Sequence, residues 1–137
     1  MSRTFALVIG IVFLVLGILG FIPLFKFGAE DYLFGIFAVD AVHNLIHVLV
    51  GALGVAAYFW DRARLYCRSL GIFYLVVGVL GFIPALIFGD EMLLGLFQVN
   101  LADNVLHLVV GAAAAYLGFA PQLGGRSVGG RPASPAS

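Results

Sequence analysis

Residues 40–47 read Asp40-Ala41-Val42-His43-Asn44-Leu45-Ile46-His47, a polar run inside a long apolar segment. The four polar side chains fall at positions i, i+3, i+4 and i+7, the spacing that places residues on one face of an α-helix. A second run with the same spacing follows sixty residues later and reads Asn100-Leu101-Ala102-Asp103-Asn104-Val105-Leu106-His107. We therefore expect two helices that each carry one polar face. We interpret the rest of the chain as the scaffold that brings these faces together inside a membrane.

The composition is that of an integral membrane protein, with the lipid bilayer as its main partner. Of the 137 residues, 63% are hydrophobic and only 10% are charged, and the mean hydropathy is +1.13. So little charge cannot cover the surface of a soluble domain of this size. The net charge is zero and there is no basic block, which argues against a nucleic-acid partner. Four apolar segments approach the length of about 20 residues needed to cross a bilayer as a helix, namely 5–25, 36–60, 70–88 and 96–119.

The chain contains an internal repeat. Residues 10–33 and 71–94 are identical at 14 of 24 positions, and after a one-residue deletion residues 35–52 and 95–112 are identical at 8 of 18. Each copy is a helix–loop–helix unit, with repeat one at 4–60 and repeat two at 65–119. A unit with two spans returns to its starting side, so both copies share one orientation about a pseudo-two-fold axis along the membrane normal. We expect an all-α, four-helix integral membrane bundle over residues 1–119.

Basic residues predict the orientation of this bundle. A Lys/Arg excess in short loops marks the cytoplasmic side. On the side of the loop after the first span, the only basic residue is Lys26, so the opposite side is predicted to be cytoplasmic. We therefore expect a multi-pass protein of the cell membrane with both termini in the cytoplasm. Residues 120–137 are rich in Gly, Pro and Ser, cannot bury apolar area, and are expected to form a disordered cytoplasmic tail. The basic residues of the predicted cytoplasmic side are Arg3, Arg62, Arg64, Arg68, Arg126 and Arg131.

Glycines repeat at the same positions in the first and third spans. Small residues let helices approach closely in lipid, where the hydrophobic effect does not drive helix association. We expect these glycines to serve packing, and the same faces could contact another protomer in a homo-oligomer. The glycines are Gly10, Gly17 and Gly20 in the first span and Gly71, Gly78 and Gly81 in the third.

The two polar faces form the candidate site. Ionisable groups within a span are costly, and they mark either a function or a partner. Counted from Ile36, His47 lies about 16 Å along the helix, close to mid-membrane. Beyond it, residues 48–57 and 108–115 contain no ionisable or amide side chain, so we expect a cluster that opens outward and is closed toward the cytoplasm. Its members are Asp40, His43, Asn44, His47, Asn100, Asp103, Asn104 and His107.

Three interpretations of this polar cluster are open. The side chains could bond to one another and hold the repeats in register, as in a structural or interaction protein. His43, His47, Asp103 and His107 could bind a zinc-like divalent metal, or His47 and His107 could be the axial ligands of a haem. The cluster could also handle protons in a proton-coupled carrier of small solutes, because histidine titrates near neutrality.

Enzymatic activity is not expected. The sequence shows no Ser–His–Asp arrangement, phosphate-binding loop or nucleotide motif, so no catalytic residue is assigned. The single cysteine, Cys67, cannot form an internal disulfide, and neither methionine lies in the polar cluster, which argues against Cu(I).

Three motifs resemble a known family. They are Gly20-Phe21-Ile22-Pro23, the run His43-Asn44-x-x-His47-x-x-x-Gly51, and the run Asn100-x-x-Asp103-Asn104-x-x-His107-x-x-x-Gly111. Together they resemble the bacterial membrane proteins grouped as domain of unknown function 4383, over roughly residues 4–118. The resemblance implies a small four-span membrane protein, and it brings no established activity, cofactor or catalytic residue.

Overall fold

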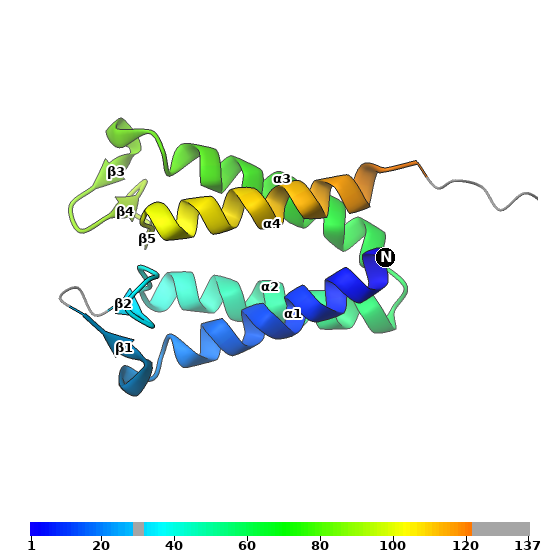
Figure 1. The fold of residues 1–137 in the computed structure, drawn as a ribbon, viewed down its shortest axis with the longest axis horizontal. Helices are drawn as coiled ribbons and strands as arrows, with labels where there is room; N and C mark the ends of the chain where they lie inside the picture. Colours follow the sequence, from blue (N-terminus) through cyan, green and yellow to red (C-terminus); the bar gives the residue numbers. More distant parts are fainter. Residues whose placement is uncertain (29–31, 122–137) are drawn as a thin grey trace, which may run out of the picture.

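The computed structural model describes residues 1–28 and 32–121 (Figure 1). In this part of the chain the long helices are α1 (Ser2–Leu19), α2 (Ala41–Phe59), α3 (Ala63–Leu80) and α4 (Leu101–Phe119). Each of the four is apolar and long enough to cross a membrane. The predicted all-α, four-span architecture is therefore confirmed. The predicted tail lies outside the described residues from position 122 onward.

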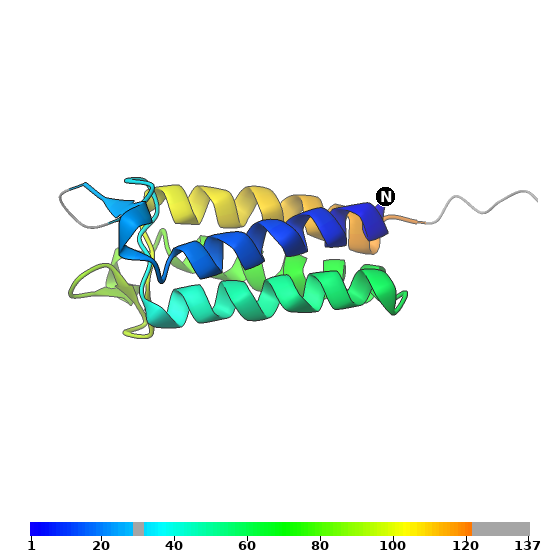
Figure 2. The ribbon, with the colours of Figure 1, turned by 90° about the horizontal axis from the view of Figure 1, so that it is seen from below.

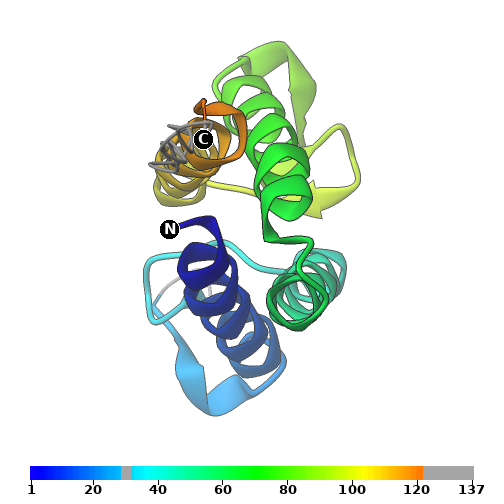
Figure 3. The same cartoon turned by 90° about the vertical axis from the view of Figure 1, so that its right-hand side faces the viewer.

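The helices pair within each half of the chain. α1 packs along α2 and α3 packs along α4, while contacts between the two pairs are sparser (Figures 1 and 3). Glycines provide the close approach: a Cβ at Gly10 would lie 2.8 Å from the backbone nitrogen of Val55 in α2. A Cβ at Gly71 would lie 2.5 Å from the backbone nitrogen of Ala115 in α4. These glycines serve packing inside each pair, as expected in lipid, and the homo-oligomer stays a prediction.

Short hairpins that the sequence did not predict connect the helices of each pair. The first contains the 3-10 turn η1 (Pro23–Phe25) and the antiparallel strands β1 (Lys26–Phe27) and β2 (Tyr32–Leu33). The second contains η2 (Pro84–Leu86) and the antiparallel strands β3 (Ile87–Phe88), β4 (Met92–Leu93) and β5 (Phe97–Gln98). Both lie at one end of the bundle, called here the hairpin end. The N-terminus and the α2–α3 turn lie at the opposite, terminal end (Figures 1 and 2).

The start of α2 moves the candidate site toward the hairpin end. The apolar segment begins at residue 36, but α2 begins at Ala41, because the Asp40 side chain caps it by accepting a hydrogen bond from the backbone N–H of His43 at 2.7 Å. His47 therefore lies only about 9 Å along the helix. The distance of about 16 Å counted from Ile36 is therefore corrected, since an apolar run does not reveal where a helix is capped, while the mid-membrane depth of His47 stays a prediction.

The closest approach of a glycine to backbone atoms between α1 and α2 gives a stability prediction. A Cβ at Gly51 would lie 2.5 Å from the backbone nitrogen of Leu14 and 2.7 Å from the carbonyl oxygen of Gly10. Backbone atoms cannot yield as a side-chain tip can, so Gly51→Ala is expected to cost about 1–3 kcal/mol in overpacking. That cost exceeds the gain of at most about 1 kcal/mol in helix propensity. The free energy of unfolding in detergent measures this effect.

Ala52 provides the matched control. It is the next residue on α2 and is exposed. Ala52→Leu adds more volume than Gly51→Ala but should change the free energy of unfolding by less than about 0.5 kcal/mol. Equal stability of the Gly51→Ala variant and the parent would contradict the close approach of α1 and α2.

Candidate functional site

Three histidines converge between the two helix pairs. His43 and His47 come from successive turns of α2, and His107 comes from α4. One ring nitrogen of each lies within 4.8 Å of those of the other two. The ring centroids are 4.5 Å apart for His43–His47, 5.8 Å for His43–His107 and 6.3 Å for His47–His107. The structure thus brings together all three histidines of the sequence, and we call this group the histidine cluster.

Aromatic rings enclose the histidine cluster. Phe13 of α1 stacks on His47 with the ring centroids 4.9 Å apart, and Tyr74 of α3 lies 4.8 Å from His107. Phe13 and Tyr74 also stack on each other, with the ring centroids 5.2 Å apart, and so join the two helix pairs beside the histidines. At the other side Phe97 of β5 lies 5.6 Å from the His43 ring.

The enclosure leaves very little free volume. The three histidines are 1%, 4% and 2% exposed, and the cavity that they line has a volume of about 10 Å³. This is about the space of one water molecule or one metal ion. The cluster was predicted to open outward, but the second hairpin covers it, a feature that helix spacing alone could not indicate.

Most of the ring nitrogens have no hydrogen-bond partner within the described chain. These are Nε2 of His43, both nitrogens of His47 and Nδ1 of His107, and the Tyr74 hydroxyl is in the same state. Leaving a buried polar group unsatisfied costs about 1–3 kcal/mol. A set of convergent, unused lone pairs beside a small cavity is the arrangement that a metal ion would satisfy.

His43 is held in one tautomer by backbone carbonyls. Its Nδ1 lies 3.0 Å from the carbonyl oxygen of Ala38 and 2.7 Å from that of Gln98. Carbonyl oxygens only accept hydrogen bonds, so Nδ1 carries the proton and the lone pair is on Nε2. This is how a carbonyl commonly orients a metal-binding histidine. The two carbonyls belong to different repeats, so the orientation of His43 depends on both.

The acidic residues join the two repeats through the backbone. Oδ2 of Asp103 accepts hydrogen bonds from the backbone N–H of Ala38 at 2.9 Å and of Asn100 at 3.0 Å. Oδ2 of Asp40 accepts one from the backbone N–H of Gln98 at 3.3 Å. Asp103 is not among the residues whose ligand atoms converge with the histidines. The structure therefore does not bring Asp103, the predicted fourth ligand, to the histidine cluster. Its carboxylate instead caps α4 and accepts a hydrogen bond from the β2–α2 connection.

The asparagines also bond outside the histidine cluster. Asn104 donates a hydrogen bond from Nδ2 to the carbonyl oxygen of Gly81 at 2.8 Å. In repeat one, the Asn44 side chain lies against Gly20. Both contacts link helices within one pair. Asn100 accepts from the backbone N–H of Asp103 at 3.1 Å and so completes a capping box for α4.

Sequence reasoning missed the aromatic enclosure of the site. Phe13 and Phe97 carry no signal that separates them from the other phenylalanines of an apolar chain. Tyr74 did carry one, because it places a hydroxyl in the apolar second half of α3. The structure buries this residue, which is 1% exposed.

Four membrane-length apolar helices around an enclosed polar cluster define a multi-pass membrane protein. A family model described as a domain of unknown function (DUF4383) matches residues 3–120, and the chain belongs to this family. The resemblance drawn from the sequence motifs is confirmed. No curated protein and no solved structure matches the chain.

Proposed function

We propose that this membrane protein binds one divalent transition-metal ion through His43, His47 and His107. The observation that carries the proposal is the convergence of three buried imidazoles whose nitrogens lack partners within the described chain. Three histidines with one open position form an established zinc-binding arrangement. Imidazole also suits Ni²⁺, Cu²⁺ and Fe²⁺, so the proposal is for this class of ion, with zinc as its reference.

The geometry requires only small movements for metal binding. Zinc–nitrogen bonds of 2.0–2.1 Å in a tetrahedron place the ligand atoms roughly 3.3 Å apart. The three nitrogens already lie within 4.8 Å of one another, and rotation of the rings can close the difference. The Tyr74 hydroxyl lines the same cavity and could accept a hydrogen bond from a water in the fourth position.

The structural role of the polar cluster belongs to other members of it. Asp40, Asn100, Asp103 and Asn104 bond to backbone groups and hold the helices and hairpins together. The histidines contribute little to this network apart from Nδ1 of His43. This division favours a binding role for the histidines alongside a structural role for the carboxylates and amides.

Two other ligand hypotheses receive less support from the geometry. A porphyrin does not fit into a cavity of about 10 Å³, which favours a single ion over haem. A proton-coupled carrier needs a polar route toward the terminal end. There, the described core contains Leu70, Val110 and Ala114 packed against Phe13 and Tyr74. We therefore propose a binding site with no continuation through the bundle.

Metal titration tests the proposal. The protein is purified in neutral detergent with a histidine-free tag, stripped with chelator and titrated with Zn²⁺ or Co²⁺. We expect one ion per chain, and Co²⁺ should show the intense visible absorption of a four-coordinate site. Weak binding without a defined stoichiometry, or the pale spectrum of six-coordinate Co²⁺, would contradict the proposal.

A further inference from the structure

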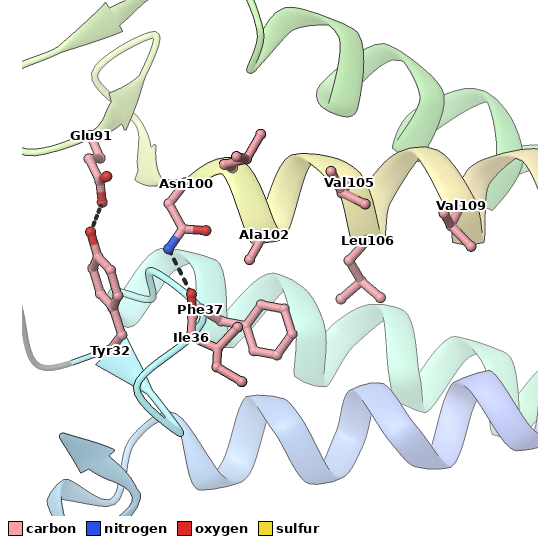
Figure 4. A pocket seen from close by; sticks show the side chains of 10 residues that line it. Tyr32, Ile36, Phe37, Glu91, Asn100, Ala102, Val105, Leu106 and Val109 are labelled. Atoms are coloured by element: carbon pink, nitrogen blue, oxygen red, sulfur yellow. Dashed lines mark hydrogen bonds between the residues drawn. The ribbon is translucent and has the colours of Figure 1, made fainter. Parts of the chain in front are cut away.

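A groove separate from the histidine cluster runs along α4. Its volume is about 770 Å³, and its lining combines the lipid-facing side of α4 with the β2–α2 connection (Figure 4). Leu101, Val105 and Val109 are 67%, 48% and 62% exposed, so the groove can be entered from the lipid. From Leu101 to Val109 it extends about 12 Å along the helix.

The hairpin end of this groove is polar. Figure 4 shows two hydrogen bonds there that join the repeats: the Tyr32 hydroxyl donates to Oε2 of Glu91 at 2.6 Å, and Nδ2 of Asn100 donates to the carbonyl oxygen of Ile36 at 2.8 Å. Glu91 is the charged residue among those that line the groove. The groove thus has a negative polar end and an apolar remainder, which is the layout of a site for an amphiphile.

We propose that this groove binds the alkyl chain of a cationic amphiphile, with the ammonium headgroup at Glu91. The Glu91 carboxylate is complementary in charge to an ammonium ion. The apolar side chains along α4 match an alkyl chain entering from the bilayer. A second copy of this chain covering the groove is the competing occupant, and the variants below distinguish the two.

Binding of three decyl compounds tests the headgroup. The stripped protein is placed in phosphatidylcholine nanodiscs and titrated with decyltrimethylammonium, decyl sulfate or decanol below their micelle concentrations, with empty nanodiscs as the background. We expect saturable binding of decyltrimethylammonium at one molecule per chain, about fivefold tighter than for the other two. Equal affinity for all three would overturn the proposal, because binding would then come from the shared decyl chain alone and not from the headgroup.

Paired variants test whether Glu91 binds the headgroup. In Glu91→Gln, the amide oxygen can still accept from the Tyr32 hydroxyl but the charge is lost, so the preference for the ammonium compound should disappear. Asp90→Asn, at the exposed neighbour outside the groove lining, is the control and should keep it. Val105→Trp should block binding by filling the groove. An unchanged preference in Glu91→Gln would overturn the proposal, and so would a disulfide-linked dimer of a Val105→Cys variant that excludes the probe.

This test is independent of the metal proposal. The groove lining shares no residue with the histidine cluster, and the stripped protein is used. Failure of one proposal would therefore leave the other unaffected.

Discussion

His47→Phe is expected to weaken zinc binding by about two orders of magnitude. A structural zinc site with four ligands contributes about 10–16 kcal/mol, so loss of one ligand removes roughly 3 kcal/mol. Phenylalanine retains an aromatic ring that can stack on Phe13, as the His47 ring does at 4.9 Å. The variant also removes two buried nitrogens that lack partners, so the metal-free protein should be as stable as the parent or more stable.

The opposite changes in affinity and stability make this variant informative. Phe73→Leu is the matched control, since Phe73 lines the same cavity without a ligand atom and should leave zinc affinity within a few fold. Calorimetric titration gives the affinity, and thermal unfolding of the stripped protein gives the stability. If His47→Phe bound zinc as well as the parent, His47 would not be a ligand. If it lost stability while neither protein bound zinc, the histidines would be structural.

Asp103→Ala should produce the largest loss of stability. The carboxylate is 1% exposed and accepts hydrogen bonds from the backbone N–H groups of Ala38 and Asn100. Its removal leaves two buried or partly buried backbone donors without an acceptor, at about 1–3 kcal/mol each, so the loss should be about 3 kcal/mol or more. The effect should be measured as the free energy of unfolding in detergent.

Two further variants identify the cause of the loss of stability. Asp103→Asn keeps an oxygen acceptor without the charge, and it should lose less stability than Asp103→Ala. Asp90→Ala removes an exposed carboxylate from the second hairpin and should change stability by less than about 0.5 kcal/mol. Equal effects of Asp90→Ala and Asp103→Ala would contradict the role given to Asp103.

The helices and the convergence of the histidines were predictable because both follow from local spacing. Apolar runs of membrane length predict spans, and residues four apart share a helix face, as His43 and His47 do. The internal repeat placed His107 at the position equivalent to His47. The residue spacing and the internal repeat can both be read from the sequence, and they need no knowledge of tertiary contacts.

The role of Asp103 was not predictable because it depends on a tertiary partner. Its spacing from His107 matches that of two metal ligands on one helix, but the backbone of Ala38, 65 residues away, is in hydrogen-bond contact with its carboxylate. The short strands were missed for a related reason: two-residue strands such as β4 and β5 are too short for a periodic pattern. Without β5, the cover that Phe97 provides could not be foreseen.

X-ray absorption at the zinc edge of the loaded protein is the most direct test of the central claim. The proposed site predicts about three imidazole nitrogens at 2.0–2.1 Å from the ion, with one further light-atom ligand. In the His47→Phe variant, the number of nitrogen ligands should fall by one. A six-coordinate oxygen shell, or a spectrum of the parent that matches zinc in buffer, would contradict a three-histidine metal site.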